Sequence, residues 1–341
     1  MIDCAVVGGG PAGLATSAAL TERGVEHQVL ERGRVGQTWR TQRWDSFRLN
    51  TPGWANAMLG EQPPDAFAPA TEVVVRLEKL APQSPVREGV EVIGLDPVGA
   101  GYTLRTTGDE ASARTVVVAT GHENVPYPPS LAQAFPERIA QYHTADYRTP
   151  AALPAGGVLV VGSAQSGCQI AEDLLAAGRR VVLATSPVGR VPVGHRRQDV
   201  FGLLFEAGFF HQRPADLPDP AMMRAAQPVF APGERGLSLP GLARAGAVLA
   251  GRLITVDGEQ AHFDGSAPDN VAAGAAFAAQ VRGMLDQLIA RAGRDVPPAE
   301  PDPLDAPVEL HPPAVLDLRE IGSVVWCTGF RGEFGVSPAA R

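Results

Sequence analysis

A short β-rich run, a glycine turn and an Ala/Leu-rich stretch follow one another at the start of this chain, and the same order returns near its middle. The two turns are Gly8-Gly9-Gly10-Pro11-Ala12-Gly13 and Gly162-Ser163-Ala164-Gln165-Ser166-Gly167. In a G-x-G-x-x-G turn the first glycine permits the tight bend, the second lets a pyrophosphate approach the backbone, and the third lets the helix pack closely on the strand. Alanine at the middle position is a tolerated variant. The repeat therefore predicts an α/β chain with two Rossmann-like domains.

The first turn has the surroundings of a dinucleotide site. Residues 2–7 are typical of a strand, residues 14–23 of a helix, and residues 25–30 of a second strand that ends in Glu31. An acidic side chain at this point can accept hydrogen bonds from ribose hydroxyls, while the helix N-terminus carries partial positive charge for the pyrophosphate. The alternative is a merely glycine-rich turn, which this context disfavours.

The second turn differs from the first at the end of its second strand. Thr185 stands where an NAD-selective site carries an acid, and Arg190, Arg196 and Arg197 follow it. A missing acid with guanidinium groups nearby favours a 2′-phosphate, so we expect NADPH rather than NADH. The alternative is that these arginines are solvated surface charge. Two dinucleotide sites in one chain are naturally linked by hydride transfer, which indicates an oxidoreductase.

Composition shifts suggest where the domains divide. Ala, Pro and Gly accumulate around residues 150–157, and the Pro-rich, acidic residues 295–313 form a connector. We expect a first domain of residues 1–152 and 310–341, with a second domain of residues 153–309 inserted in it, each a three-layer ββα unit. Further elements are expected as a helix over 71–80, a meander over 90–95, 101–106 and 113–119, a hairpin over 253–263 and a helix over 272–292.

Charge and cysteine usage exclude several classes of protein. The formal net charge is −8 and no basic block extends beyond Arg196-Arg197, so a nucleic-acid partner is not expected. Three dispersed cysteines, at 4, 168 and 327, fit a reducing compartment and offer no cysteine pair or zinc-ligand spacing. No apolar run approaches the roughly 18 residues of a membrane span. We expect a soluble, cytoplasmic protein without metal or membrane partner.

Further motifs, taken in order, resemble those of the two-dinucleotide-domain flavoproteins. They are Gly36-Gln37-Thr38-Trp39-Arg40, Ser46-Phe47-Arg48-Leu49-Asn50-Thr51-Pro52, Ala119-Thr120-Gly121 and Cys327-Thr328-Gly329-Phe330. The whole set is most similar to class B flavin-containing monooxygenases, of the flavin-containing, Baeyer–Villiger and N-hydroxylating types. The resemblance implies FAD on the first turn and NADPH on the second. It also implies hydride transfer to FAD, O2 activation at the flavin C4a position and oxygenation of a small organic substrate.

The resemblance further implies site residues at matching positions. Asn50 falls where the family places an asparagine near the flavin and the nicotinamide, which makes it the candidate catalytic residue; the alternative is an ordinary turn residue. The expected cofactor-binding residues are Gly8, Gly10, Pro11, Ala12, Gly13, Glu31, Arg32, Thr38, Trp39, Arg40, Asn50, Thr51, Thr120, Gly121, Gly162, Ser163, Ala164, Gln165, Ser166, Gly167, Thr185, Arg190 and Gly329.

Two departures from the family pattern leave other functions open. Only His143-x-x-x-Tyr147 remains of a longer family motif, because Glu137 and Ile139 replace its Phe and Gly. After Phe330 the family continues through a strand and a helix that close the flavin domain, whereas this chain ends at Arg341. The alternatives are an FAD-dependent oxidase or reductase without oxygen transfer, and a C-terminally shortened, non-catalytic flavin- or nucleotide-binding protein. The substrate and a homo-oligomeric state stay open.

Overall fold

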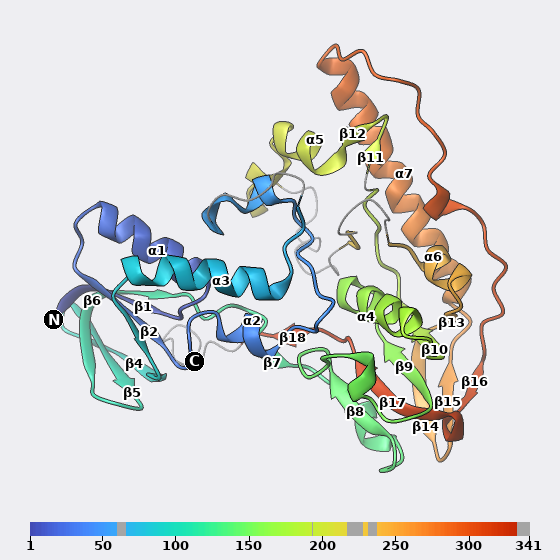
Figure 1. Ribbon diagram of the computed structural model, residues 1–341, viewed down its shortest axis with the longest axis horizontal. Coiled ribbons are helices and arrows are strands. Elements are labelled where there is room, and N and C mark those ends of the chain that lie inside the picture. Colours follow the sequence, from blue (N-terminus) through green and yellow to red (C-terminus); the bar gives the residue numbers. More distant parts are fainter. Residues whose placement is uncertain (60–65, 193, 217–227, 231–236, 333–341) are drawn as a thin grey trace. The chain divides into compact units, whose positions relative to one another are not determined.

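The chain forms two compact units, which we describe from a computed structural model (Figure 1). The structure describes residues 1–59, 66–192, 194–216, 228–230 and 237–332. The first unit comprises Met1–Tyr127 with Gly329–Arg341, and the second comprises Pro128–Thr328. The second unit is thus inserted in the first, as the sequence predicts.

The first unit is built on a six-stranded sheet of order β3-β2-β1-β6-β5-β4. Its strands are β1 (Ile2–Val7), β2 (His27–Glu31), β3 (Val86–Glu88), β4 (Val92–Val98), β5 (Gly101–Thr106) and β6 (Ala111–Val118). Strands β3, β2, β1 and β6 are parallel, whereas β6, β5 and β4 form the expected antiparallel meander. Helices α1 (Pro11–Glu22), α2 (Gln37–Thr41) and α3 (Ala70–Leu80) complete the unit.

Alternation along β1 explains why both faces of this sheet are covered. Cys4 and Val6 point to one side, where Leu20 of α1 packs against them. Ala5 and Val7 point to the other side and pack against Leu104 of the meander. A parallel strand buried on both faces is apolar where it is buried, as residues 4–7 of this strand are.

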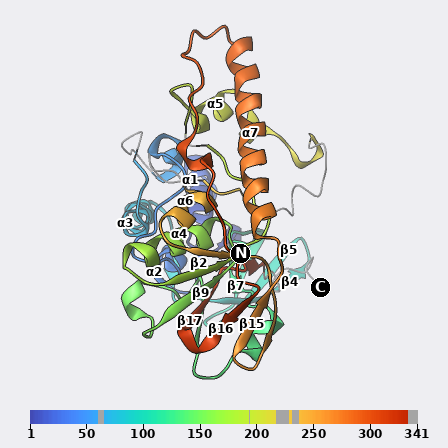
Figure 2. The same cartoon turned by 90° about the vertical axis from the view of Figure 1, so that its right-hand side faces the viewer.

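The second unit repeats this plan with a five-stranded parallel sheet of order β13-β10-β9-β17-β8. Its strands are β8 (Ala140–His143), β9 (Gly157–Val161), β10 (Val181–Ala184), β13 (Val248–Ala250) and β17 (Ile321–Trp326). Helices α4 (Gln165–Ala176) and α6 (Leu239–Arg244) belong to this unit, and α4 packs on β9 and β10. Figure 2 turns this unit toward the viewer.

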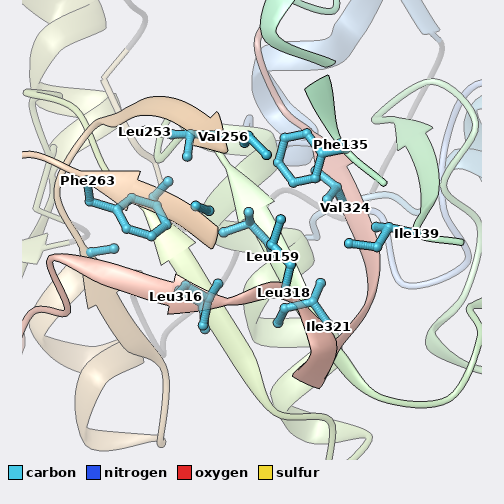
Figure 3. Packing of buried hydrophobic residues seen from close by; sticks show 14 of the residues in the cluster. Phe135, Ile139, Leu159, Leu253, Val256, Phe263, Leu316, Leu318, Ile321 and Val324 are labelled. Carbon is cyan, nitrogen blue, oxygen red and sulfur yellow. The ribbon is translucent and has the colours of Figure 1, made fainter. Parts of the chain in front are cut away.

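A second, antiparallel sheet supplies the third layer of this unit. It contains β14 (Leu253–Asp257), β15 (Gln260–Phe263) and β16 (Val315–Asp317), and the first two form the expected hairpin. Figure 3 shows Leu159 of β9 and Val324 of β17 packed in one buried cluster with Val256, Phe263 and Leu316 of the smaller sheet. These layers, with α4 on the parallel sheet, confirm the expected α/β fold class.

The observed division of the chain differs from the expected one at both boundaries. Residues 128–152 and 310–328, which we expected in the first domain, lie in the second unit. The reason is strand pairing, because β17 lies between β9 and β8 and completes the parallel sheet of the second unit. The Pro-rich connector of residues 295–313 therefore lies wholly in the second unit, and the chain returns to the first unit only after Thr328.

The longest helix of the described residues is α7 (Ala267–Arg291), which begins five residues before the expected start at 272. Pro268 in its first turn fits, since proline has no N–H to lose there. Its outer half packs through Val281, Leu285 and Ile289 against α5 (Val200–Glu206). Among the described residues, no helix is long and apolar enough to cross a bilayer.

Candidate functional site

The first glycine turn has the shape that its sequence predicts. Gly8 has a φ of +112°, and a Cβ there would lie 2.5 Å from the carbonyl oxygen of Ala119. A Cβ on Gly13 would overlap the carbonyl oxygen of Gly8. A Cβ on Gly10, by contrast, would meet no atom within 4 Å. The packing of the chain thus requires glycine at 8 and 13, whereas position 10 faces open space beside the N-terminus of α1.

Glu31 ties the first turn to the loop after β2. Its side chain is buried, its Oε2 accepts from the Gly9 N–H at 2.6 Å, and its Oε1 accepts from the Gly33 N–H at 2.8 Å. Each carboxylate oxygen keeps a second lone pair that a ribose hydroxyl could use. A Cβ on Gly9 would lie 3.0 Å from the Cβ of Glu31. Glycine at position 9 therefore has a packing role that the sequence motif does not reveal.

Thr120 lies beside this turn at the end of β6. Its Cα would be 3.4 Å from a Cβ on Gly8, and its Oγ1 is buried with no hydrogen-bond partner among the described residues. Gly121, which follows, has a φ of +74°. An unbonded, buried hydroxyl at the carboxyl end of parallel strands fits a ligand hydrogen bond, since this edge is where open α/β sheets bind ligands. Gly10, Glu31 and Thr120 together fit a flavin dinucleotide.

The polar, aromatic loop after β2 also approaches the first turn. The Gly36 N–H donates to the Gly9 carbonyl at 3.2 Å, and Gly36 precedes α2 with a φ of +71°. Trp39 makes an edge contact with Phe47 at 5.9 Å between ring centroids. The Arg40 guanidinium bonds to Glu78 at 2.5 Å, so its charge is neutralised within the unit. A backbone hydrogen bond therefore anchors this loop to the first turn, and the ion pair between Arg40 and Glu78 anchors it to α3.

The remaining residues expected at this site lie in less regular segments. Asn50 is half-buried, just before η1 (Gly53–Leu59). The Thr51 hydroxyl donates to the side chain of Asn56 at 2.8 Å, which fixes the turn after Asn50. Arg32 is exposed, and the Gly329 carbonyl accepts from the Tyr127 N–H at 3.2 Å.

The second turn reproduces the geometry of the first. Ala164 precedes α4 with φ −75° and ψ −169°, close to the φ −85° and ψ −172° of Gly10 before α1. Gly162 has a φ of +108°, and a Cβ there would overlap the carbonyl oxygen of Cys327. The end of β17 thus closes the second turn as Ala119, after β6, closes the first. A Thr-Gly pair follows each closing strand, at 120–121 after β6 and at 328–329 after β17. This repeated pair is the sequence signal for the closure.

Three polar residues expected to bind cofactor make hydrogen bonds inside the second unit. The Thr185 side chain is only 2% exposed, donates to the Ala250 carbonyl at 2.7 Å and accepts from Asn270 at 3.0 Å. The Ser163 hydroxyl bonds to the backbone of Ser186, and the Gln165 amide bonds to the backbone of Phe230. These side chains hold the loops around the turn.

The arginines expected to read a 2′-phosphate do not form one cluster. Arg190 is only 5% exposed, and its guanidinium bonds to Asp302 at 3.0 Å and to Asp305. Arg196 bonds to Asp286 at 2.7 Å. Arg197 has a side chain that is 78% exposed. The interpretation of these arginines as solvated charge holds for Arg197, whereas Arg190 lies in a buried ionic network.

Other reactive side chains of the second unit are buried or hydrogen-bonded inside the protein. Burial raises the pKa of the Cys168 and Cys327 thiols to about 12, so both are protonated near neutral pH. The His143 Nδ1 accepts from the Ala145 N–H at 3.2 Å, in the turn after β8. Burial, and a 2.6 Å hydrogen bond donated to Asp173, raise the pKa of the Tyr147 hydroxyl.

Comparisons with known proteins place this geometry in context. A family model described as pyridine nucleotide-disulphide oxidoreductase matches residues 5–190. A CzcO-like oxidoreductase of Geobacillus kaustophilus is 33% identical over 180 residues, 51% of this chain and 51% of the relative. Indole-3-pyruvate monooxygenase YUCCA1 of Oryza sativa is 29% identical over 250 residues, 69% of this chain and 60% of the relative. The matches therefore span about half to three-fifths of these relatives.

A solved structure extends the comparison to the whole fold. A variant of a flavin monooxygenase from Stenotrophomonas maltophilia has a TM-score of 0.60 and 19% identity, covering 99% of this chain and 81% of that chain. At this identity the likeness concerns the fold alone. It agrees with the resemblance that the ordered motifs indicate.

Proposed function

The chain belongs to the pyridine nucleotide-disulphide oxidoreductase family, and from this membership we propose that it is an FAD-dependent monooxygenase that oxidises NADPH. Its other substrates are O2 and a small organic molecule. The observation that carries the proposal is the duplicated turn, because Gly10 and Ala164 precede their helices with the same extended backbone. One chain thus has two pyrophosphate sites, as the coupling of two dinucleotides requires.

The first unit would hold FAD through Gly10, Glu31 and Thr120. The N-terminus of α1 offers partial positive charge to the pyrophosphate, and the open space beside Gly10 lets it come close. The Glu31 carboxylate at the end of β2 and the Thr120 hydroxyl after β6 supply hydrogen bonds from the two sides of β1, at the carboxyl ends of these parallel strands. When bound, FAD supplies two-electron redox chemistry with a hydride donor and with dioxygen.

The second unit would hold NADPH at Ala164 and the N-terminus of α4. The tight packing of Gly162 and Gly167 brings the helix start to the edge of the parallel sheet, as in the first unit. Asn50 is the proposed catalytic residue, since an amide both donates and accepts hydrogen bonds and can orient a polar reacting group. The loop after β2 positions it.

The thiols support a monooxygenase over a disulphide reductase within the same family. A dithiol enzyme needs an accessible thiol with a lowered pKa. Cys4, Cys168 and Cys327 are all buried, and burial raises the pKa of the latter two to about 12. Oxygenation of an external substrate uses no protein thiol.

The experiment that tests this proposal follows three quantities in one reaction. We expect the purified protein to show a flavin absorbance spectrum that NADPH bleaches without oxygen. With oxygen and a panel of amines, sulfides and ketones, NADPH consumption should match the oxygenated product formed. Hydrogen peroxide as the sole product with every substrate would instead indicate an oxidase, and a protein that binds no flavin would contradict the proposal altogether. Asn50→Ala should lower turnover while the protein retains its flavin.

A further inference from the structure

A connector of unusual length joins α7 to β16. Residues 292–314, which we call the strap, contain one short regular element, η8 (Pro303–Asp305), and seven prolines. Figures 1 and 2 show the strap running back along the second unit from the far end of α7. Connectors of more than about 12–15 residues without regular structure are uncommon in compact domains and usually functional.

The strap is fastened to the second unit around η8. The Ser238 hydroxyl donates to the Leu304 carbonyl at 3.0 Å. Arg244 donates to the carbonyls of Ala306 at 2.8 Å and Pro303 at 3.0 Å. These hydrogen bonds to neutral carbonyls hold η8 in place. They leave the carboxylates of Asp305 and of Asp302, which caps η8, available to other partners.

Those carboxylates neutralise two arginines. Asp302 bonds to Arg190 at 3.0 Å, and Asp305 bonds to Arg190 and, at 2.7 Å, to Arg282. The Arg282 Nη1 lies 3.6 Å from Asp302 and has no hydrogen-bond partner among the described residues. Two guanidinium and two carboxylate groups leave the cluster with no net charge and with one buried donor unsatisfied.

The cluster lies beside the second turn. A cavity of about 30 Å³ is lined by Ser163 of that turn, by Gly189 and Arg190 after β10, and by Ser238 and Asp305. Arg190 follows the second strand of the dinucleotide unit, which is where this fold reads the ribose 2′ position. The strap therefore brings two carboxylates to the point at which a 2′-phosphate would bind.

We propose that the strap competes with the 2′-phosphate for Arg190 and Arg282, and that Asp302 and Asp305 must leave these arginines when NADPH binds. This inference rests on the proposed function. With the strap closed, the neutral cluster does not attract the doubly charged 2′-phosphate, and the carboxylates of Asp302 and Asp305 repel it. Opened, the two guanidinium groups match the charge and the geometry of a phosphate. NADH has no such group, so its binding leaves the strap closed.

Binding of NADP+ and NAD+ to the FAD-loaded full chain tests the proposal. Asp302→Asn retains the hydrogen-bonding side chain that caps η8, and Asp305→Asn retains the shape of the residue. We expect each to lower the Kd for NADP+ about tenfold, since a charge-assisted hydrogen bond no longer competes, and to change the Kd for NAD+ less than about twofold. The matched control is Glu309→Gln, an exposed carboxylate of the same strap, which should change neither Kd.

Hydrogen exchange of the wild-type protein gives an independent measurement. The amides of Leu304, Asp305 and Ala306 are bonded within η8 and report on its closure. NADP+ should speed their exchange, and NAD+ should not. Equal Kd changes for both nucleotides, or slower exchange with NADP+, would overturn the inference alone. Failure of all flavin-loaded variants to bind either nucleotide would overturn the proposed function together with it.

Discussion

Gly10 differs from the other glycines of its turn, because no packing contact of the protein requires glycine at this position. A side chain at 10 meets no atom of the protein and the φ of −85° suits any residue, whereas a Cβ at 13 overlaps the carbonyl of Gly8. We predict that Gly10→Leu folds with a melting temperature near that of the wild type but binds no FAD. The measurement is the flavin absorbance of the purified variant beside its thermal melt.

Gly13→Ala provides the contrast for this prediction. It should lower the stability of the first unit by several kcal/mol, because a backbone carbonyl cannot move aside as a flexible side chain can. A Gly10→Leu variant that retains full flavin content would show that the turn does not bind the pyrophosphate.

At the residue scale, the sequence predicts backbone roles better than side-chain roles. The glycines act through their own φ angles and the adjacent turn, which the local pattern contains. Thr185, Ser163 and Gln165 instead bond to Ala250, Ser186 and Phe230. Two of these three partners lie 65 residues away in the chain, so a motif of a few residues carries no sign of them.

At the element scale, the hairpin of β11 (Gly194–His195) and β12 (Gln198–Asp199) contains local strain. Arg196 and Arg197 both have positive φ, +50° and +58°, in a two-residue turn that favours Asn-Gly. We predict that Arg197→Gly is more stable than Arg197→Ala by about 1 kcal/mol, because only glycine relieves the left-handed backbone.

Chemical denaturation of the two variants checks this prediction. Both lose the exposed Arg197 side chain and its 3.7 Å approach to Glu300, so their difference isolates the backbone. Equal stability of the two variants would contradict the assignment of strain to this turn.

The elements themselves follow closely from sequence periodicity. The helix at α3, the meander and the β14–β15 hairpin lie where the pattern predicts them, within a few residues at their ends. The start of α7 is missed because residues 267–271 have little apolar periodicity and are fixed by burial of Ala267 and Asn270. The Asn270 amide reaches Thr185, a contact made by the tertiary structure.

At the scale of the whole molecule, the division into units can be tested with fragments. We predict that residues 128–328 fold alone and unfold cooperatively, whereas residues 153–309 do not. The shorter fragment lacks β8, β16 and β17, so it exposes the buried strand β9 as an unpaired edge. Thermal melts followed by circular dichroism measure this difference. A cooperative melt of the shorter fragment would contradict the pairing of β17 in the second unit.

The two dinucleotide turns were determined by sequence alone, because a strand, a glycine turn and a helix start depend on residues within about 25 positions of one another. The membership of β17 in the second sheet and the neutralisation of Arg190 were decided only by tertiary structure. Asp302 lies 112 residues after Arg190, and the two charges pair because an unpaired buried charge is costly. Local backbone geometry depends on residues that are neighbours in the sequence, whereas the partner of a buried charge depends on which distant segment the fold brings to it.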